Sequence, residues 1–174
     1  MNTANTAPLT IRTLTESDID AFHALRLQAT VDTPYGIVPT HEEEARWTRE
    51  DNIARVRETD QQAVFGAFDG AALIGIVGWR REARRKLAHK SLIWGVFVKP
   101  EYRRTGVARR LMERAIEHAR ASGVAQVHLS VGARNPRAQT LYRSLGFTVY
   151  GTEPRSLYID GEFFDEELMI LRLD

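Results

Sequence analysis

The spacing of hydrophobic residues along the chain changes near residue 103. Before it, short apolar runs alternate with turn signals: residues 63–68 and 73–79 flank Asp69-Gly70, a strong hairpin signal, and residues 92–98 form a third run. After it, apolar residues recur three and four positions apart, which predicts one face of an amphipathic helix. The residues on that face are Ala108, Leu111, Met112, Ala115, Ile116 and Ala119.

The start of the chain predicts a short strand and then a helix. Residues 9–12 alternate between apolar and polar side chains, after a polar tail at residues 1–8 that we expect to be flexible. Thr15 and Asp18 have the spacing of a capping box, so they predict a helix that begins there and continues to about Thr30.

A break and a second helix are predicted next. Two prolines and a glycine in residues 34–39 cannot continue the first helix. Thr40 and Glu43 form another capping-box pair, and Trp47 and Ala54 supply apolar contacts further along, so we expect one helix over this stretch.

The second half of the chain alternates between helices and strands. A short strand is predicted at residues 127–131, between Gly123 and Gly146, which both suit left-handed helix caps. The Asp160-Gly161 turn and the apolar run at residues 168–171 follow. With the antiparallel strands before it, this order predicts an α+β fold with a mixed central β-sheet flanked by helices.

Composition narrows the possible classes of protein. The chain has 174 residues, a net charge of +1 and 27% charged residues, so we expect one domain over residues 1–174 and no partner selected by bulk charge. It has no cysteine, which excludes disulfides, thiolate catalysis and cysteine metal sites. No signal peptide and no membrane-spanning apolar run are present, so the interpretation is a cytoplasmic protein without a membrane partner.

One turn has the features of a phosphate site. A strand, a basic turn, a glycine and a helix aim unpaired backbone N–H groups at an anion. Gly106 lets a phosphate approach the main chain because it has no Cβ, and Arg103 and Arg104 add positive charge. The complete turn consists of Arg103, Arg104, Thr105, Gly106, Val107 and Ala108.

Two motifs together resemble a known family. The turn lacks the spacing of a P-loop or of a dinucleotide fingerprint, and it matches the Arg/Gln-x-x-Gly-x-Gly/Ala signature of the GNAT acetyltransferases. Residues 135–147 match that family's Asn-x-x-Ala-x-x-Leu-Tyr-x-x-x-Gly-Phe segment throughout. The resemblance is clear from about residue 92 to residue 173. It implies the GNAT fold, acetyl-CoA as co-substrate without a metal, and an acceptor pocket lined by the region around residues 34–39.

The resemblance also implies which residues bind the donor. The N–H groups of Thr105, Gly106, Val107 and Ala108, with Arg103 and Arg104, would take the pyrophosphate, although Arg104 could equally be a solvated side chain. The edge of the third apolar run would pair with the pantetheine arm like an extra strand, and an N–H there could polarise the thioester carbonyl. That edge consists of Val96, Phe97 and Val98.

Three residues of the second motif are candidates for the site. Tyr142 is the leading general acid, because a phenol is protonated at working pH and the motif aligns it with the tyrosine that meets the coenzyme sulfur; a core aromatic is the alternative. Asn135 precedes Pro136, so it is an N-cap candidate as well as a coenzyme contact by resemblance. Arg143 could reach the 3′-phosphate, with a solvated helix face as the safer assumption.

The general base is not identified by the sequence. Many relatives carry a glutamate on the strand before the phosphate turn, but residues 91–98 contain no carboxylate. A water relay through Ser130, His128 or backbone carbonyls would serve instead, as would a carboxylate from elsewhere, such as Glu43 or Glu167.

The resulting hypothesis is an N-acetyltransferase in which an amine attacks acetyl-CoA directly in a ternary complex. The acceptor would be an amino acid, a polyamine, another small amine or a protein N-terminus, and a homodimer is left open. One alternative is an acyl-CoA sensor without turnover. Another is an enzyme acting on aminoacyl-RNA through the basic residues of the 80–86 stretch, which we interpret instead as a solvated hairpin tip.

Overall fold

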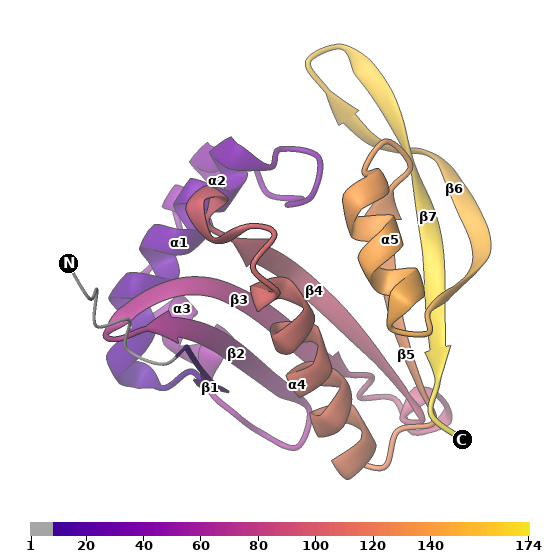
Figure 1. Cartoon of the computed structure of the whole chain (residues 1–174), viewed down its shortest axis with the longest axis horizontal. Helices are drawn as coiled ribbons and strands as arrows, with labels where there is room; N and C mark the ends of the chain where they lie inside the picture. The colour runs from indigo at the N-terminus through magenta and orange to yellow at the C-terminus, as the bar shows by residue number, and fades with distance from the viewer. Residues whose placement is uncertain (1–8) are drawn as a thin grey trace, which may run out of the picture.

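Within residues 9–174, the part of the chain that this computed structural model describes, seven strands form one mixed sheet in the order β1-β2-β3-β4-β5-β7-β6 (Figure 1). The strands are β1 (Thr10–Thr13), β2 (Gln62–Asp69), β3 (Ala72–Arg81), β4 (Lys90–Val98), β5 (Gln126–Gly132), β6 (Thr148–Ile159) and β7 (Glu162–Arg172). The α-helices are α1 (Ile19–Asp32), α2 (His41–Ala45), α3 (Arg49–Val56), α4 (Val107–Ala121) and α5 (Pro136–Ser144). The predicted α+β class with a mixed sheet is confirmed; the predicted tail at residues 1–8 lies outside the described residues.

Strands β4 and β5 form the one parallel pair of the described sheet, and they pair over a short distance. Their register joins Lys90 to Gln126, Ser91 to Val127 and Leu92 to His128. Figure 1 shows the two strands side by side near the C-terminus and diverging away from it. From residue 93 to residue 98, β4 therefore pairs with β3 on one side and with no strand of the described chain on the other.

A bulge lies in the unpaired part of β4. Ile76 faces Phe97 and Gly78 faces Trp94, so β3 has one residue where β4 has two. One of those two is Gly95, whose φ of +63° is in the left-handed region that favours glycine. Such a bulge bends its strand and increases its twist, which accounts for the separation of β4 from β5 at this level.

Helices cover both faces of the sheet. On β2, alternate residues face opposite sides: Phe65 belongs to a hydrophobic cluster with α4, and Val64 to a second cluster with α1 and α3. The predicted apolar face of α4 is confirmed, because it is buried from Leu111 to Ala119 while Ala108 is half-buried. The amphipathic pattern thus predicted the buried face of this helix correctly from local sequence alone.

The helix predicted after Thr40 is wrong as a single element. α2 ends at Ala45, and α3 begins at Arg49 after a second capping box. The Thr48 hydroxyl accepts a hydrogen bond from the Asp51 N–H at 3.1 Å, and the Asp51 carboxylate accepts one from the Thr48 N–H at 2.9 Å. This local pair satisfies the N–H groups of a new helix start, so the chain turns there.

The first predicted helix is corrected in a smaller way. Its opening turn, Glu16–Asp18, is a 3₁₀ helix, and the α-helix continues two residues past Thr30. Gly123 and Gly146 have φ angles of +71° and +95°, which confirms both predicted left-handed caps. No helix within residues 9–174 combines the length and the hydropathy that crossing a bilayer requires.

Candidate active site

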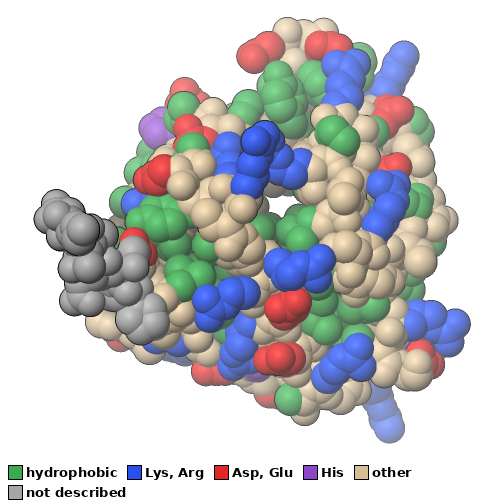
Figure 2. Space-filling model, in the orientation of Figure 1, with side chains coloured by type: hydrophobic (Ala, Val, Ile, Leu, Met, Phe, Trp, Pro, Cys, Tyr) green, Lys and Arg blue, Asp and Glu red, His purple; other side chains and the backbone are tan. Residues whose placement is uncertain are grey.

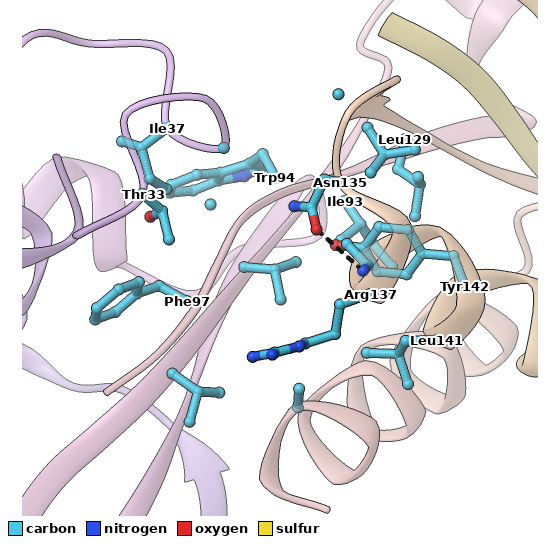
Figure 3. Close-up of a pocket in the computed structure, with 18 of the residues that line it drawn as sticks. Thr33, Ile37, Ile93, Trp94, Phe97, Leu129, Asn135, Arg137, Leu141 and Tyr142 are labelled. Atoms are coloured by element: carbon cyan, nitrogen blue, oxygen red, sulfur yellow. Dashed lines mark hydrogen bonds between the residues drawn. The ribbon is translucent and has the colours of Figure 1, made fainter. Parts of the chain in front are cut away.

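The divergence of β4 and β5 opens a pocket with a volume of about 940 Å³. Both strands line it, together with the segment from Thr33 to Pro39, the start of α4, and α5. Figure 2 shows its opening on one face of the molecule, with Lys and Arg side chains near the rim, and Figure 3 shows the side chains inside. The region that the resemblance assigned to the acceptor pocket therefore lines the same cavity as the phosphate turn.

The phosphate turn forms the N-terminus of α4. Gly106 is the N-cap residue, with φ +86°, and a Cβ built on it would have no atom within 4 Å. The Thr105 hydroxyl closes the turn by donating to the Tyr102 carbonyl at 2.5 Å. The N–H groups at the start of a helix have no intrahelical partner, so the open space beside Gly106 suits an anion. Thr105 is the one predicted turn residue that does not line the pocket.

Arg103 is held against β4 with part of its guanidinium unsatisfied. Its Nε donates to the Val98 carbonyl at 3.1 Å, and its guanidinium lies 5.7 Å from the centre of the Phe97 ring. Its Nη2 is buried and has no hydrogen-bond partner among the described residues. A buried donor without an acceptor is costly, so this atom fits a ligand oxygen. Arg104 is exposed at the pocket rim.

The predicted edge of β4 lines the pocket, and so do two of the candidate residues of the second motif. Val96, Phe97 and Val98 do so from β4, and Asn135 and Tyr142 do so from the opposite side. The Asn135 side chain accepts a hydrogen bond from the Ala138 N–H at 3.2 Å, which confirms the N-cap prediction.

Tyr142 is both a core residue and a pocket residue. It is 7% exposed, and its ring centre lies 6.1 Å from that of Phe147. Burial raises the pKa of Tyr142 to about 12, so the phenol keeps its proton at neutral and mildly alkaline pH.

Arg143 lies apart from the pocket. Its guanidinium forms an ion pair with the Glu167 carboxylate at 2.8 Å, and about half of its side chain is exposed. Arg137 lines the pocket instead, as Figure 3 shows, and sequence reasoning did not select it. Helical spacing was the available signal, because Arg137 lies one turn before Leu141, which also lines the pocket.

The residues considered as bases are separated by the structure. Glu43 caps α2 through the Thr40 N–H at 2.9 Å, and His128 bonds to Gln126 at 2.8 Å; neither lines the pocket. Ser130 does, and its hydroxyl donates to Glu166 at 3.3 Å.

Glu166 is a pocket residue that sequence reasoning missed. Among the described residues it is the sole carboxylate in the lining, and it also accepts a hydrogen bond from Ser156 at 2.6 Å. Its neighbour Glu167, which was considered, pairs with Arg143. Adjacent strand residues point to opposite faces, so only one of the two could face the pocket, and the register decides which one.

This chain belongs to the GNAT acetyltransferase family: residues 22–147 match the model described as the Acetyltransferase (GNAT) family. It is therefore an acyltransferase enzyme, as its named relatives are. It is 31% identical to the N-alpha-acetyltransferase RimI of Mycobacterium tuberculosis over 160 residues, which cover 91% of this chain and 90% of that protein.

Two further similarities concern length and fold. The chain is 34% identical to the mycothiol acetyltransferase of Thermobispora bispora over 135 residues, which cover 75% of this chain but 43% of that relative, so the match spans less than half of the relative's length. YncA from Salmonella typhimurium, solved with acetyl-CoA, superposes with a TM-score of 0.84 at 22% identity, covering 97% of this chain and 95% of that one. The second similarity confirms the fold.

Proposed function

We propose that this enzyme transfers the acetyl group of acetyl-CoA to the primary amine of a small molecule or peptide, by direct attack in a ternary complex. The observation that supports this most directly is a single cavity lined by Gly106, the unpaired edge of β4, and Tyr142. One cavity that holds donor and acceptor together makes the reaction effectively unimolecular, and no covalent enzyme intermediate is needed.

The pocket residues fit the donor. The open space at Gly106 and the unsatisfied Nη2 of Arg103 suit the pyrophosphate oxygens. Arg104, Arg109 and Arg137 line the same region and add positive charge. The free edge of β4 offers main-chain groups to the amides of the pantetheine arm, as a neighbouring strand would.

Tyr142 is the proposed general acid. As the new C–N bond forms and the C–S bond breaks, the departing sulfur takes up a negative charge. Tyr142 lines the pocket and is protonated at working pH, since burial raises its pKa to about 12. It therefore holds a proton at the cavity that it donates to the sulfur as the negative charge develops there.

Glu166 is the proposed general base. An α-amino group is largely protonated at neutral pH and attacks only as the free amine. Glu166 lines the pocket and is oriented by hydroxyl donors from Ser130 and Ser156, so it accepts this proton directly or through one water. Residues 91–98 contain no carboxylate. With Glu166 as the base, that absence is no reason to prefer an acyl-CoA sensor without turnover.

The relatives suggest chemical classes of acceptor, and no single acceptor molecule. One of the two relatives is named as an N-alpha-acetyltransferase and the other as a mycothiol acetyltransferase. A shared fold does not transfer a substrate, because one scaffold hosts many acceptors. The aminoacyl-RNA alternative has no support at the pocket, since the 80–86 stretch contributes no lining residue.

The test is an amine panel with purified protein and acetyl-CoA, in which thiol release is followed and the acetylated product is identified by mass spectrometry. We expect amine-dependent thiol release and an acetylated amine. Tight acetyl-CoA binding without release for any amine would support the sensor instead. Absence of acetyl-CoA binding by calorimetry would contradict the proposal altogether.

A further inference from the structure

A buried cluster of three charged side chains lies where the pocket meets α1 and α3. Arg26 is 2% exposed and Glu44 is fully buried, and Arg55 is mostly covered. Arg26 donates to the Glu44 carboxylate through Nε at 3.1 Å and Nη2 at 2.8 Å, and Arg55 donates to it through Nη1 at 2.7 Å. Both carboxylate oxygens are therefore occupied by guanidinium donors.

The cluster keeps a net positive charge. Burial alone would raise the pKa of Glu44, but the hydrogen bonds from Arg26 and Arg55 outweigh it and hold that pKa below its usual value. Glu44 is thus ionised at neutral pH, and two guanidinium groups face one carboxylate. A buried unit with an excess positive charge is expensive unless an anion compensates it.

One donor of the cluster is unsatisfied next to the pocket. The Nη1 of Arg26 is buried and has no hydrogen-bond partner among the described residues. It lies against the bulge of β4, where a Cβ built on Gly95 would be 3.1 Å from it. Arg26, Arg55 and Gly95 all line the pocket, so the unsatisfied donor and the excess charge are at the same place.

This place is separate from the phosphate turn. The arginines considered above for the phosphates come from the turn before α4, from α4 and from α5, whereas Arg26 and Arg55 come from α1 and α3 on the opposite face of the sheet. Trp94 of β4 lines the pocket and also packs against the cluster, because the Arg26 and Arg55 guanidinium groups lie 5.9 Å and 5.3 Å from its ring centre. The bulge of β4 therefore has donor-binding residues on one side and this cluster on the other.

We propose that Arg26, supported by Arg55, binds a carboxylate carried by the acceptor amine, so that the substrate class is amino acids and not polyamines. This inference rests on the proposed function. A carboxylate would satisfy Nη1 and compensate the excess charge with a charge-assisted hydrogen bond. The amine of the same molecule would face Glu166, the one lining carboxylate among the described residues. The pocket would then match a zwitterion, with opposite charges at its two ends.

The first test uses matched acceptors with the wild-type enzyme. α-, β- and γ-amino acids are each compared with their own primary amides, and spermidine serves as the polyamine. A charged hydrogen bond of this kind corresponds to a preference of about 10- to 100-fold in kcat/KM for the free acids. The amide is a demanding comparison for the free acid. Its amine is less basic, so a larger fraction of it is unprotonated and able to attack at neutral pH.

The second test uses Arg26→Lys, which keeps a positive charge beside Glu44 but loses the planar fork and its free Nη1. We expect the KM for amino acids to rise to that of their amides, while the KM for amides and the affinity for acetyl-CoA stay unchanged. Arg49→Lys is the matched control, since Arg49 pairs with Asp20 outside the pocket at 2.5 Å. If Arg26→Lys does not fold, the wild-type comparison still decides.

The outcomes separate the two proposals. Acetylation of amines without any preference for the carboxylate overturns this inference and leaves the proposed function standing, as does spermidine as the best acceptor. No acetylation of any amine contradicts the proposed function itself.

Discussion

Tyr142 packs in the hydrophobic core and also lines the pocket. Its ring contacts Phe147, and it is 7% exposed. A phenylalanine would keep the ring and remove only the hydroxyl, so this position allows packing and chemistry to be measured separately.

For Tyr142→Phe we expect kcat to fall by about 10²–10⁴-fold, because the departing sulfur loses its proton donor. The affinity for acetyl-CoA, measured by calorimetry, should change little. Full activity with a lowered melting temperature would mean that the residue has a packing role alone.

The same hydroxyl should affect stability at alkaline pH. The ordinary pKa of tyrosine is 10.0, and burial raises that of Tyr142 to about 12. Between these values the unfolded chain releases the proton and the folded protein keeps it, so the stability contribution is full below pH 10 and is lost as the pH rises to 12. The loss amounts to about 2–3 kcal/mol. In urea titrations, wild type should lose more stability over this window than Tyr142→Phe; parallel curves would argue against the raised pKa.

Two adjacent carboxylates provide a matched test of the base. Glu166→Gln should lower kcat/KM by about 10²–10⁴-fold at neutral pH, because the side-chain amide keeps the shape of the carboxylate but takes no proton. Its oxygen can still accept a hydrogen bond from one of Ser130 and Ser156, while its NH2 group donates to the other hydroxyl. Glu167→Gln changes the neighbouring residue, which pairs with Arg143 outside the pocket, and should be nearly silent. Equal activity of both variants with wild type would favour a relay of waters and backbone carbonyls.

For individual residues, the sequence predicted a place in the pocket where the residue has a fixed position within a motif. Tyr142 and Gly106 follow from local spacing, and both line the pocket. Arg137 and Glu166 did not follow, because helix phase and strand register select them over Arg143 and Glu167. Register depends on distant pairings, which a local pattern does not contain.

Among the elements, the turn before α4 can be tested with an internal control. Gly106 and Gly123 both have left-handed φ angles, +86° and +71°, and a Cβ on either would meet no atom within 4 Å. Alanine at each position should therefore cost a similar amount of stability, about 1–2 kcal/mol. Gly106→Ala alone should weaken acetyl-CoA binding, because only its Cβ enters the proposed phosphate position. Equal binding by the two variants would contradict the phosphate assignment.

Most elements could be predicted because their signals are local. The hairpin at Asp69-Gly70, the apolar face of α4 and the glycine caps depend on neighbours within a few residues. The divergence of β4 from β5 could not be predicted. It depends on the bulge at Gly95 and on a parallel pairing between strands joined by a whole helix, and neither leaves a short-range pattern.

Across the whole molecule, charge is distributed unevenly. The net charge is +1, yet the described pocket lining contains six arginines and one carboxylate. Positive charge is thus concentrated at the pocket, and the remaining residues of the chain carry a net negative charge. We expect this arrangement to attract anionic molecules to the pocket and not to make the rest of the protein bind polyanions.

The basic stretch at residues 80–86 tests this view. Arg84, Arg85 and Lys86 are exposed, whereas Arg81 donates to the Ala88 and Ser122 carbonyls and stays unchanged in the test. Replacing Arg84, Arg85 and Lys86 by alanine should leave kcat/KM for a small amine within about 2-fold, as expected for surface substitutions. A large loss of salt-sensitive RNA binding in the same variant would instead revive the aminoacyl-RNA hypothesis.

The short pairing between β4 and β5 has a thermodynamic consequence. Three residue pairs join the two halves of the sheet directly, and beyond them the edge of β4 has no strand to pair with in the described chain. If acetyl-CoA lies along that edge, it forms the main-chain hydrogen bonds that a neighbouring strand would form. Its binding free energy then adds to the free energy of unfolding. At a donor concentration 100 times its Kd the folded state gains about 2.7 kcal/mol. A cell that runs short of acetyl-CoA would then hold this enzyme in its least stable form, so donor supply would influence how long the protein persists as well as how fast it works.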